Sequence, residues 1–271
     1  MTEEMKTHLK NCLRQLQLST FAENFAQQSA LAANEGWSYD QFLLNLCQLE
    51  IDARSQRKIE KFLQASRLPR EKTLSTFDRT RLKKNVEKQF AMLMTEEFLA
   101  HRENVLVFGN PGSGKTHLLA ALGHELVHRG HAVYFVSCVL LVQRLLRAKV
   151  DLRLEKELKR LDRFEALIID DIGYVQQSRE EMEVLFTLLA HRYESRSVLL
   201  TSNLVFSQWE NIFKDPMTTA AAIDRLVHHS TILELNLLSY RVEAAQNKKL
   251  KIELNIIDRN ERIDPIEPAG V

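Results

Sequence analysis

The stretch Gly109-Asn-Pro-Gly-Ser-Gly-Lys-Thr116 decides the fold class, because it matches the full phosphate-binding loop pattern of nucleotide-binding proteins. The apolar run Asn104-Val-Leu-Val-Phe108 precedes it as a buried strand should, and a helix is predicted from Lys115 to about Arg129. In this arrangement glycines let backbone N–H groups turn toward phosphates, the lysine reaches the outer phosphates, and the helix directs its positive end at the same anion. We therefore expect the chain to bind ATP or GTP.

Two groups of residues are predicted to contact the nucleotide and its Mg2+. Those of the loop are Gly109, Asn110, Pro111, Gly112, Ser113, Gly114, Lys115, Thr116 and His117, with the Thr116 hydroxyl coordinating Mg2+. The second group ends the predicted strand Ala166-Leu-Ile-Ile-Asp-Asp171. Asp170 is expected to hold Mg2+ through its water shell, and Asp171 to polarise the attacking water. Asp171 is one methylene shorter than the glutamate often found there, so it is either a general base or a group that only orients water.

Beyond the loop, short apolar runs alternate with helical patterns, as a parallel α/β sheet flanked by helices requires. The candidate strands are Val105–Phe108, Ala132–Ser137, Ala166–Asp170, Ser197–Ser202 and Thr231–Glu234. Residues 1–68 have helical periodicity instead, which predicts a small all-helical N-terminal domain. Because Leu68-Pro69 ends a helix and no strong pattern follows Arg241, we predict a linker at 69–78, an α/β domain at 79–243 and a C-terminal tail at 244–271.

Two apolar stripes and one basic cluster organise the predicted N-terminal helices. The stripes are Leu9, Leu13 and Leu16, and Phe42, Leu43, Leu46 and Leu49. The basic cluster is Arg54, Arg57, Lys58 and Lys61. This cluster is either a solvated helix face or a contact with DNA or a neighbouring subunit.

Composition limits the setting of the chain. Its 271 residues, 45% hydrophobic and 27% charged, suffice for one full domain core and a smaller accessory unit. The net charge of +1 means that any nucleic-acid surface must be local. Cys12, Cys47 and Cys138 are widely separated, which fits reduced thiols and argues against a disulfide framework or a zinc site. The N-terminus lacks a signal pattern and no stretch approaches the roughly 18 apolar residues that span a bilayer, so we expect a cytoplasmic protein without membrane contact.

The segment Cys138–Arg163 predicts two helices between the second and third strands, and it is strongly basic. It holds eight basic residues against four acidic ones, a local net charge of +4. It is either a solvated helix pair, in which pairs such as Glu155 with Lys159 satisfy much of the charge, or a nucleic-acid surface. The candidate DNA contacts are Arg144, Arg147, Lys149, Arg153, Lys156 and Lys159.

Polar and basic residues follow the later strands. Asn203 ends the run Ser197-Val-Leu-Leu-Thr-Ser-Asn203, and a strand beside the acidic one would bring it close to the γ-phosphate or its water. Alternatively, Asn203 only ends a strand by turn formation. Arg225 and Arg241 stand on either side of the last strand, and each alone indicates little. Arg192 suits either a subunit interface or a structural salt bridge with Glu194 or another acid.

Taken in order, these motifs resemble the AAA+ ATPases of the initiator and helicase-loader branch. More closely, they resemble the IstB-like ATP-binding proteins, which are related to the helicase loader DnaC. The resemblance rests on Leu74-Ser-Thr-Phe-Asp78, the loop, Ile169-Asp-Asp-Ile-Gly-Tyr174, Arg192-Tyr-Glu194, Thr201-Ser-Asn203, Ile223-Asp-Arg225 and Ser239-Tyr-Arg241. It implies an AAA+ core with ATP as cofactor, Asn203 as sensor 1, Arg225 as an arginine finger for the neighbouring subunit's ATP, and Arg241 as the sensor-2 arginine. The basic helices take the place of the initiator-specific element.

The resemblance also implies an activity. The chain is expected to hydrolyse ATP, to form ATP-dependent rings or helical homo-oligomers on duplex DNA, and to recruit and stimulate an IstA-like transposase. An arginine given in trans couples ATP binding to association, because it stabilises the interface only while the γ-phosphate is present. Two alternatives stay open. A DnaC-like helicase loader would prefer single strands, and a metabolic P-loop kinase would act as a monomer and keep its activity after Arg225→Ala.

Overall fold

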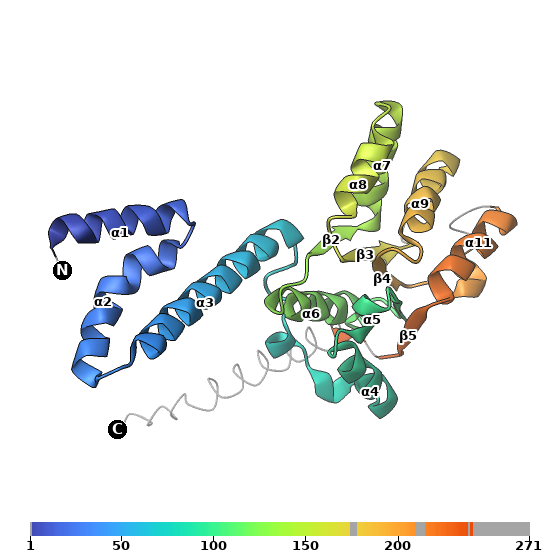
Figure 1. Cartoon of the computed structure of the whole chain (residues 1–271). Coiled ribbons are helices and arrows are strands. Elements are labelled where there is room, and N and C mark those ends of the chain that lie inside the picture. Colours follow the sequence, from blue (N-terminus) through green and yellow to red (C-terminus); the bar gives the residue numbers. More distant parts are fainter. Residues whose placement is uncertain (1, 174–177, 210–214, 238, 241–271) are drawn as a thin grey trace, which may run out of the picture. The chain divides into compact units, whose positions relative to one another are not determined.

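The computed structural model describes residues 2–173, 178–209, 215–237 and 239–240, and the chain divides into two compact units (Figure 1). The first unit comprises the residues up to Ala65 together with 128–130, and the second comprises the other described residues. None of the helices in the described ranges combines the length and the apolarity that crossing a bilayer requires.

The first unit is helical, as predicted, and has a small core. Its helices are α1 (Glu3–Gln15), α2 (Ser19–Glu35) and α3 (Tyr39–Ser66). Its core consists of Phe21, Phe25 and Leu46, with Leu13, Leu18, Phe42, Cys47 and Leu49 packed against them. Leu16 and Leu43 do not belong to the core, although the predicted stripes include them, and they are 67% and 55% exposed. Leu16 follows the last turn of α1, and Leu43 lies about 100° around α3 from its neighbour Phe42.

A buried carboxylate joins α3 to the start of α2. Leu18, which precedes α2, has no side chain that could cap the helix. Glu50 of α3 takes this role, because its carboxylate accepts hydrogen bonds from the backbone N–H groups of Thr20 at 2.8 Å and Phe21 at 3.4 Å. Burial opposes the charge of Glu50, but hydrogen bonds from Arg54 and Thr20 outweigh it and keep the pKa of this carboxyl below its ordinary value.

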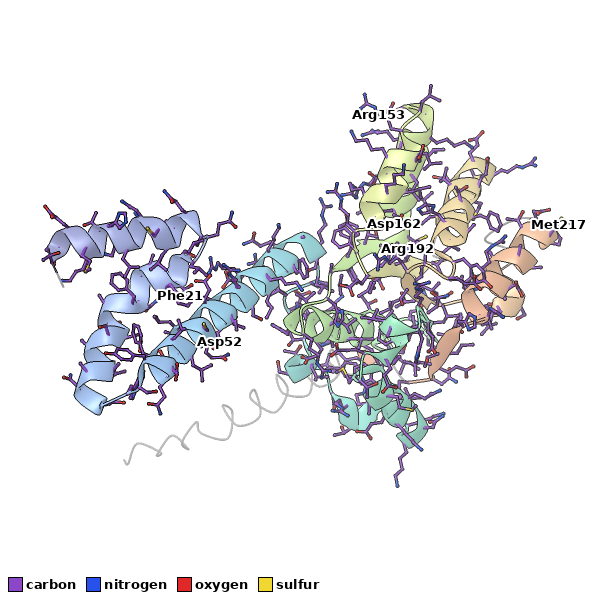
Figure 2. All side chains as sticks on the ribbon, viewed as in Figure 1. Phe21, Asp52, Arg153, Asp162, Arg192 and Met217 are labelled. Atoms are coloured by element: carbon purple, nitrogen blue, oxygen red, sulfur yellow. The ribbon has the colours of Figure 1, made fainter. Side chains whose placement is uncertain are left out.

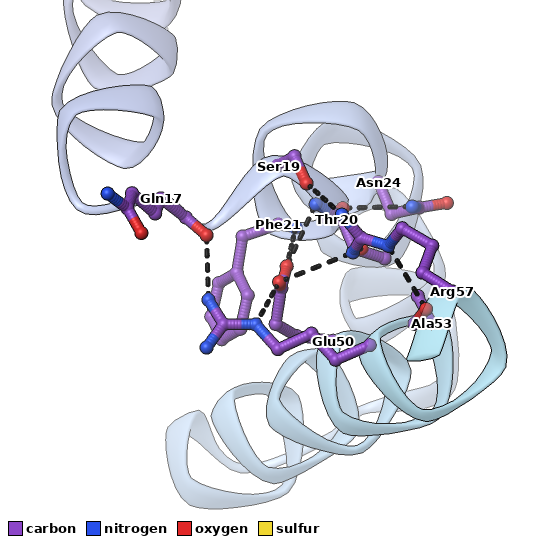
Figure 3. A network of polar contacts seen from close by, with 9 residues as sticks. Gln17, Ser19, Thr20, Phe21, Asn24, Glu50, Ala53 and Arg57 are labelled. Atoms are coloured by element: carbon purple, nitrogen blue, oxygen red, sulfur yellow. Dashed lines mark hydrogen bonds and ion pairs between the residues drawn. The ribbon is translucent and has the colours of Figure 1, made fainter. Parts of the chain in front are cut away.

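Arg54 and Arg57, two members of the predicted basic cluster, complete the contact between α3 and the start of α2. Figure 3 shows Arg57 beside Ser19 and Thr20. Arg54 donates from Nε to Glu50 at 2.7 Å and from Nη2 to the carbonyl of Gln17 at 2.7 Å. Arg57 donates from Nη1 to the Ser19 hydroxyl at 3.0 Å. These two arginines therefore connect α3 to the start of α2, a contact that the sequence did not predict, while both side chains remain 53% exposed to solvent.

The second unit alternates strands and helices. Before the first strand come η1 (Leu74–Thr76), η2 (Arg79–Arg81), α4 (Lys84–Leu93) and α5 (Glu97–Ala100). The strands are β1 (Asn104–Gly109), β2 (Val133–Ser137), β3 (Ala166–Ile172), β4 (Ser197–Ser202) and β5 (Ser230–Leu235). Between and after them lie α6 (Lys115–His128), α7 (Cys138–Val150), α8 (Leu154–Leu161), α9 (Arg179–Arg192), η3 (Phe206–Gln208) and α11 (Pro216–Val227).

The strands form one parallel sheet in the order β2-β3-β4-β1-β5. Side chains of α7, α8, α9 and α11 pack on one face, in a core that includes Leu106, Leu167 and Leu200. Gly123 of α6 packs against Ile168 on the opposite face. The predicted α/β fold is confirmed, and each predicted strand differs from the observed one by at most two residues at either end. Because β4 lies between β1 and β3, the carboxyl ends of these three strands meet at one edge of the sheet.

Candidate functional site

The phosphate-binding loop joins β1 to α6, and its backbone has the conformation that the motif requires. Gly112 and Gly114 have φ values of +79° and +96°, which side-chain-bearing residues rarely adopt. The Ser113 hydroxyl is buried and has no hydrogen-bond partner among the residues that the structure describes. Such an orphaned donor is unfavourable unless a ligand satisfies it. The loop therefore fits a group that brings hydrogen-bond acceptors to it, as a phosphate does.

Lys115 begins α6 and turns its side chain back into the loop. The residue is buried, and its Nζ donates to the carbonyls of Gly109 at 2.7 Å and Asn110 at 2.9 Å. It also donates to Oδ1 of Asn203 at 2.6 Å. The ammonium group is thus fixed between the loop and the end of β4, where Asn203 lies.

The end of β3 is connected to the same lysine through Asn203. Nδ2 of Asn203 donates to Oδ1 of Asp171 at 3.0 Å, so one amide contacts both Lys115 and Asp171. The pairing of β3 with β4 shifts register between Ile169 and Ile172, and Asp171 has a φ of +67°. A positive φ at a non-glycine residue costs on the order of 1–3 kcal/mol and is often found at functional sites. The structure thus brings together the loop lysine, the second strand carboxylate and the predicted sensor.

Thr201 connects both carboxylates to β4, a role that the sequence did not predict. Its hydroxyl donates to Oδ1 of Asp170 at 2.8 Å and accepts from the backbone N–H of Asp171 at 2.8 Å. Thr201 is 1% exposed, so both hydrogen bonds are shielded from water. Threonine is common in strands because its side chain is β-branched. Its presence in β4 therefore did not indicate that its hydroxyl binds the carboxylates.

Ser239 and Tyr240, which are distant in sequence from the loop, contact it. The backbone N–H of Tyr240 donates to the Gly112 carbonyl at 2.9 Å, and a Cβ at Gly112 would lie 2.1 Å from the Ser239 hydroxyl oxygen. Ser239 and Tyr240 begin the predicted Ser-Tyr-Arg motif. Arg241 itself, like the predicted tail at 244–271, lies outside the described residues.

The predicted linker also lies against the loop and the start of α6. The Phe77 ring is 3.5 Å from the position of a Cβ at Gly114, and its centroid is 5.1 Å from that of the His117 ring. Nε2 of His117 lies 3.1 Å from both the Thr76 hydroxyl and the Thr73 carbonyl. Burial lowers the pKa of His117 below its ordinary value. His117, predicted as a nucleotide contact, therefore has its ring engaged with the preceding segment.

Arg192 has a structural role. The residue is 1% exposed, and its guanidinium donates to four backbone carbonyls, which belong to Leu161, Phe164, Glu165 and Ser197. It also pairs with Asp162, at a nitrogen–oxygen distance of 3.8 Å. Both residues are labelled in Figure 2. Burial lowers the pKa of Arg192 to about 10. Of the two predicted alternatives, the structure supports an internal role, with Asp162 in place of Glu194.

Arg225 lies on α11 against α9. Its Nη1 donates to the Ala221 carbonyl at 3.1 Å, and its guanidinium carbon lies 4.8 Å from the centroid of the Phe186 ring. The residue is half-buried. The ring contact fixes the side chain along α9 and leaves part of it accessible.

The helices α7 and α8 are confirmed within the predicted basic segment and enclose a groove of about 840 Å3. The groove is lined by Arg144, Arg147, Ala148, Asp151, Arg153, Glu155, Lys156, Glu157, Lys159, Arg160 and Arg163. Figure 2 shows Arg153 at the outer end of this helix pair. The groove therefore combines seven basic residues with three acidic ones in one concave surface.

The candidate DNA contacts fall into two classes by their partners. Arg144 pairs with Glu157 at 2.5 Å and donates to the Tyr134 hydroxyl at 2.8 Å. Lys159 pairs with Glu155 at 2.5 Å, as the sequence spacing suggested, and Lys149 reaches Glu183 of α9 at 2.9 Å. The side chains without a partner among the described residues are those of Arg147, Arg153 and Lys156. Lys149 is the one candidate that is not among the residues lining the groove, and its role in DNA binding stays a prediction.

Comparison with known proteins identifies the family. The profile of the family described as IstB-like ATP binding protein matches residues 11–248. The chain belongs to this family. A protein of Sinorhizobium fredii named as an insertion-sequence ATP-binding protein is 41% identical to it over 240 residues, which are 88% of this chain and 80% of that one. A protein of Geobacillus stearothermophilus named for the insertion sequence IS5376 is 36% identical over 249 residues, which are 92% and 98% of the two chains.

Known structures share the fold of this IstB-like chain at lower sequence identity. DnaI is 24% identical with a TM-score of 0.52, over 62% of this chain and 95% of its own. DnaA of Aquifex aeolicus, determined with bound AMPPCP, is 17% identical with a TM-score of 0.54, over 69% of this chain and 57% of its own. These likenesses confirm the predicted fold of a parallel sheet flanked by helices.

Proposed function

We propose that this chain is an ATP-hydrolysing AAA+ protein that assembles on duplex DNA and stimulates a partner transposase. The observation that carries the proposal is the continuous chain of hydrogen bonds from Lys115 through Asn203 to Asp171. It joins the phosphate-binding loop to the acidic strand, as ATP hydrolysis requires. Membership of the IstB-like family and the basic groove support the DNA-directed part of the proposal.

The nucleotide would be held by the loop. The buried Ser113 hydroxyl and the backbone N–H groups around Gly112 and Gly114 would donate to its phosphates, and Lys115 would contribute positive charge. Thr116 and Asp170 would hold Mg2+, which neutralises charge that develops on the phosphates. Thr201 would hold the Asp170 carboxylate and Asn203 would hold the Asp171 carboxylate through their hydrogen bonds. Asp171 would then keep one orientation toward an attacking water.

Association is the second element of the proposal. Arg225 is half-buried against Phe186 and would offer its guanidinium to the ATP of a neighbouring subunit. Arg241, which follows Ser239 and Tyr240 in the sequence, would act as sensor 2. An arginine given in trans favours association only while the γ-phosphate is present, so homo-oligomers would form with ATP and loosen after hydrolysis. Such head-to-tail contacts produce rings or helical assemblies.

DNA is the third element. Arg147, Arg153 and Lys156 line the α7–α8 groove and have no partner in the described part of the chain, so they can neutralise phosphates without first breaking an ion pair there. Each phosphate contact contributes about 0.9 to the slope of log K against log salt concentration. Replacing all three residues by alanine should reduce that slope by about 2.7 on duplex DNA. Lys149→Ala is the matched control, because Lys149 pairs with Glu183 outside the groove. An equal change in both variants would contradict this assignment.

The transposase partner follows from the relatives, which are named as ATP-binding proteins of insertion sequences. The central experiment measures the mass of the assembly on a short duplex and on the matching single strand, with ATP and with ADP. We expect large complexes only with ATP and duplex DNA, and we expect Arg225→Ala to abolish them. A monomer under every condition would contradict the proposal. Preference for the single strand would instead favour a helicase loader.

A further inference from the structure

Two histidines and a glutamate meet at the edge of the sheet opposite the nucleotide loop. Glu194 precedes β4, and His228 and His229 precede β5, so all three lie at the amino ends of parallel strands whose carboxyl ends carry the candidate site. Each side chain offers one ligand atom, and these atoms lie within 4.8 Å of one another. All three residues are exposed, and the described ranges contain no second group of this kind.

A common anchor holds the two turns that carry these side chains. Arg102 donates from Nη1 to the Glu194 carbonyl at 2.8 Å. Asn104 donates its backbone N–H to the His229 carbonyl at 2.7 Å, and its Nδ2 to the Leu226 carbonyl at 3.1 Å. Arg102 and Asn104, at the start of β1, therefore fix the backbone on both sides of the group. Preorganised ligands lose less conformational entropy when they bind an ion.

The histidine rings are themselves oriented. The hydroxyl of Tyr193 lies 3.0 Å from Nδ1 of His228, and the ring centroids of His228 and His229 are 4.1 Å apart. A ring whose Nδ1–H donates to an oxygen keeps its Nε2 lone pair for a metal, which is the usual arrangement around metal-bound histidines. Tyr193 thus supplies the kind of supporting contact that such sites contain.

We propose that Glu194, His228 and His229 form a binding site for a divalent transition metal ion, with Zn2+ as the best match. Two imidazoles and one carboxylate are a donor set that Zn2+ accepts, with the fourth position left to water or another ligand. Mg2+ prefers oxygen ligands, so the ion proposed for the nucleotide does not suit this group. The sequence argued against zinc only through its cysteines, and this group contains none.

The metal would join the turn after α9 to the turn after α11. These are the two helices between which the Arg225 guanidinium contacts the Phe186 ring. Metal binding would therefore stabilise the helix pair that orients Arg225. This consequence for a trans-acting arginine rests on the proposed function, whereas the binding of the metal does not.

The test measures Zn2+ binding to the full chain by isothermal titration after treatment with a chelator, with excess Mg2+ in the buffer. We expect one Zn2+ per chain, bound with similar affinity with or without nucleotide. Loss of a supporting contact alone weakens metal sites by about 10–100-fold, so Tyr193→Phe should reduce affinity by about tenfold. His228→Ala and His229→Ala remove direct ligands and should reduce it by about 100-fold or more.

His8→Ala is the matched control, because Nε2 of His8 lies 3.8 Å from Sγ of Cys12 and offers a competing soft site. The proposal is contradicted if His8→Ala removes the binding, if the His228 and His229 variants retain wild-type affinity, or if Zn2+ does not bind. A thiolate charge-transfer band after Co2+ substitution would also overturn it. If the chain binds Zn2+ but does not assemble on DNA, the proposed function is contradicted and the metal site is not.

Discussion

Thr201→Val is expected to show how much the hydrogen bonds of the Thr201 hydroxyl contribute to ATP hydrolysis, because it leaves Asp170 and Asp171 themselves unchanged. Valine has nearly the shape of threonine, so the buried position stays filled, but both hydrogen bonds of the hydroxyl are lost. Asp170 loses a donor at 2.8 Å and the Asp171 N–H loses its acceptor at 2.8 Å. The N–H of Asp171 belongs to a residue whose backbone is already strained at a φ of +67°.

The size of the effect follows from these two bonds. A neutral hydrogen bond contributes about 1 kcal/mol and one to a charged group about 1.5–3 kcal/mol. Because Asp170 is only half-buried, we take the lower part of this range and expect a loss of about 2 kcal/mol. In a domain of this size, the loss corresponds to a decrease in Tm of about 4–8 °C. The displaced carboxylate should lower kcat for ATP hydrolysis by about 10–100-fold, equivalent to about 1.4–2.8 kcal/mol in the barrier.

The assay compares Thr201→Val with Thr201→Ser, which keeps the hydroxyl and removes only a methyl group. Single-turnover hydrolysis, nucleotide affinity and thermal unfolding are measured on both. We expect Thr201→Ser to stay close to wild type in hydrolysis, and Thr201→Val to bind nucleotide but hydrolyse it slowly. If the two variants hydrolyse ATP at the same rate, the hydroxyl does not position the carboxylates, and the reasoning fails.

Three further changes test other parts of the molecule. Asn203→Ala removes the amide between the loop lysine and the strand carboxylate, so steady-state turnover should fall by more than nucleotide affinity, and an equal loss of both would count against this. Glu50 has a folded pKa below its ordinary 4.5, so its contribution to stability is present above that pH and is lost as pH falls through the folded value. Glu50→Gln should therefore destabilise the first unit at neutral pH and weaken the loss of its stability at acid pH. If the dependence of stability on pH is unchanged, Glu50 does not act as the cap of α2. Burial opposes the charge of His131, but hydrogen bonds to Glu165 at 2.8 Å and Glu96 at 2.7 Å raise its pKa above 6.5. Its contribution is full below pH 6.5 and is lost as pH rises through the folded pKa, so His131→Gln should reduce the decline of thermal stability above pH 6.5, and a decline of wild-type size would contradict this.

The architecture of the second unit was predictable because each strand is a short apolar run bounded by polar residues. Parallel strands of an α/β fold end at one edge of the sheet, so the proximity of Asn203 to the loop and to the acidic strand followed from their places at strand ends. Lys115, Asn203 and Asp171 do meet there. The boundary of each strand was less predictable, since hydrogen bonding continues by a residue or two beyond the apolar run.

The contacts that sequence analysis missed involve backbone groups or long-range partners. Arg192 binds four carbonyls, and backbone carbonyls belong to every residue, so no pattern marks them. Glu50 caps a helix that begins about 30 residues earlier in the chain, a distance at which no local rule applies. Lys149 looked equivalent to its basic neighbours, and only the packing of α7 on α9 directs it to Glu183.

The left-handed backbone at Asp171 has a consequence for which acids this position tolerates. Aspartate and asparagine enter that conformation more readily than most residues, because their short polar side chains form hydrogen bonds with nearby groups. Glutamate, whose side chain is one methylene longer, lacks this advantage. Asp171→Asn should therefore leave the backbone unchanged and report on chemistry alone, whereas Asp171→Glu would add conformational strain to any gain in reach. The shorter acid is the one that this turn of the chain favours.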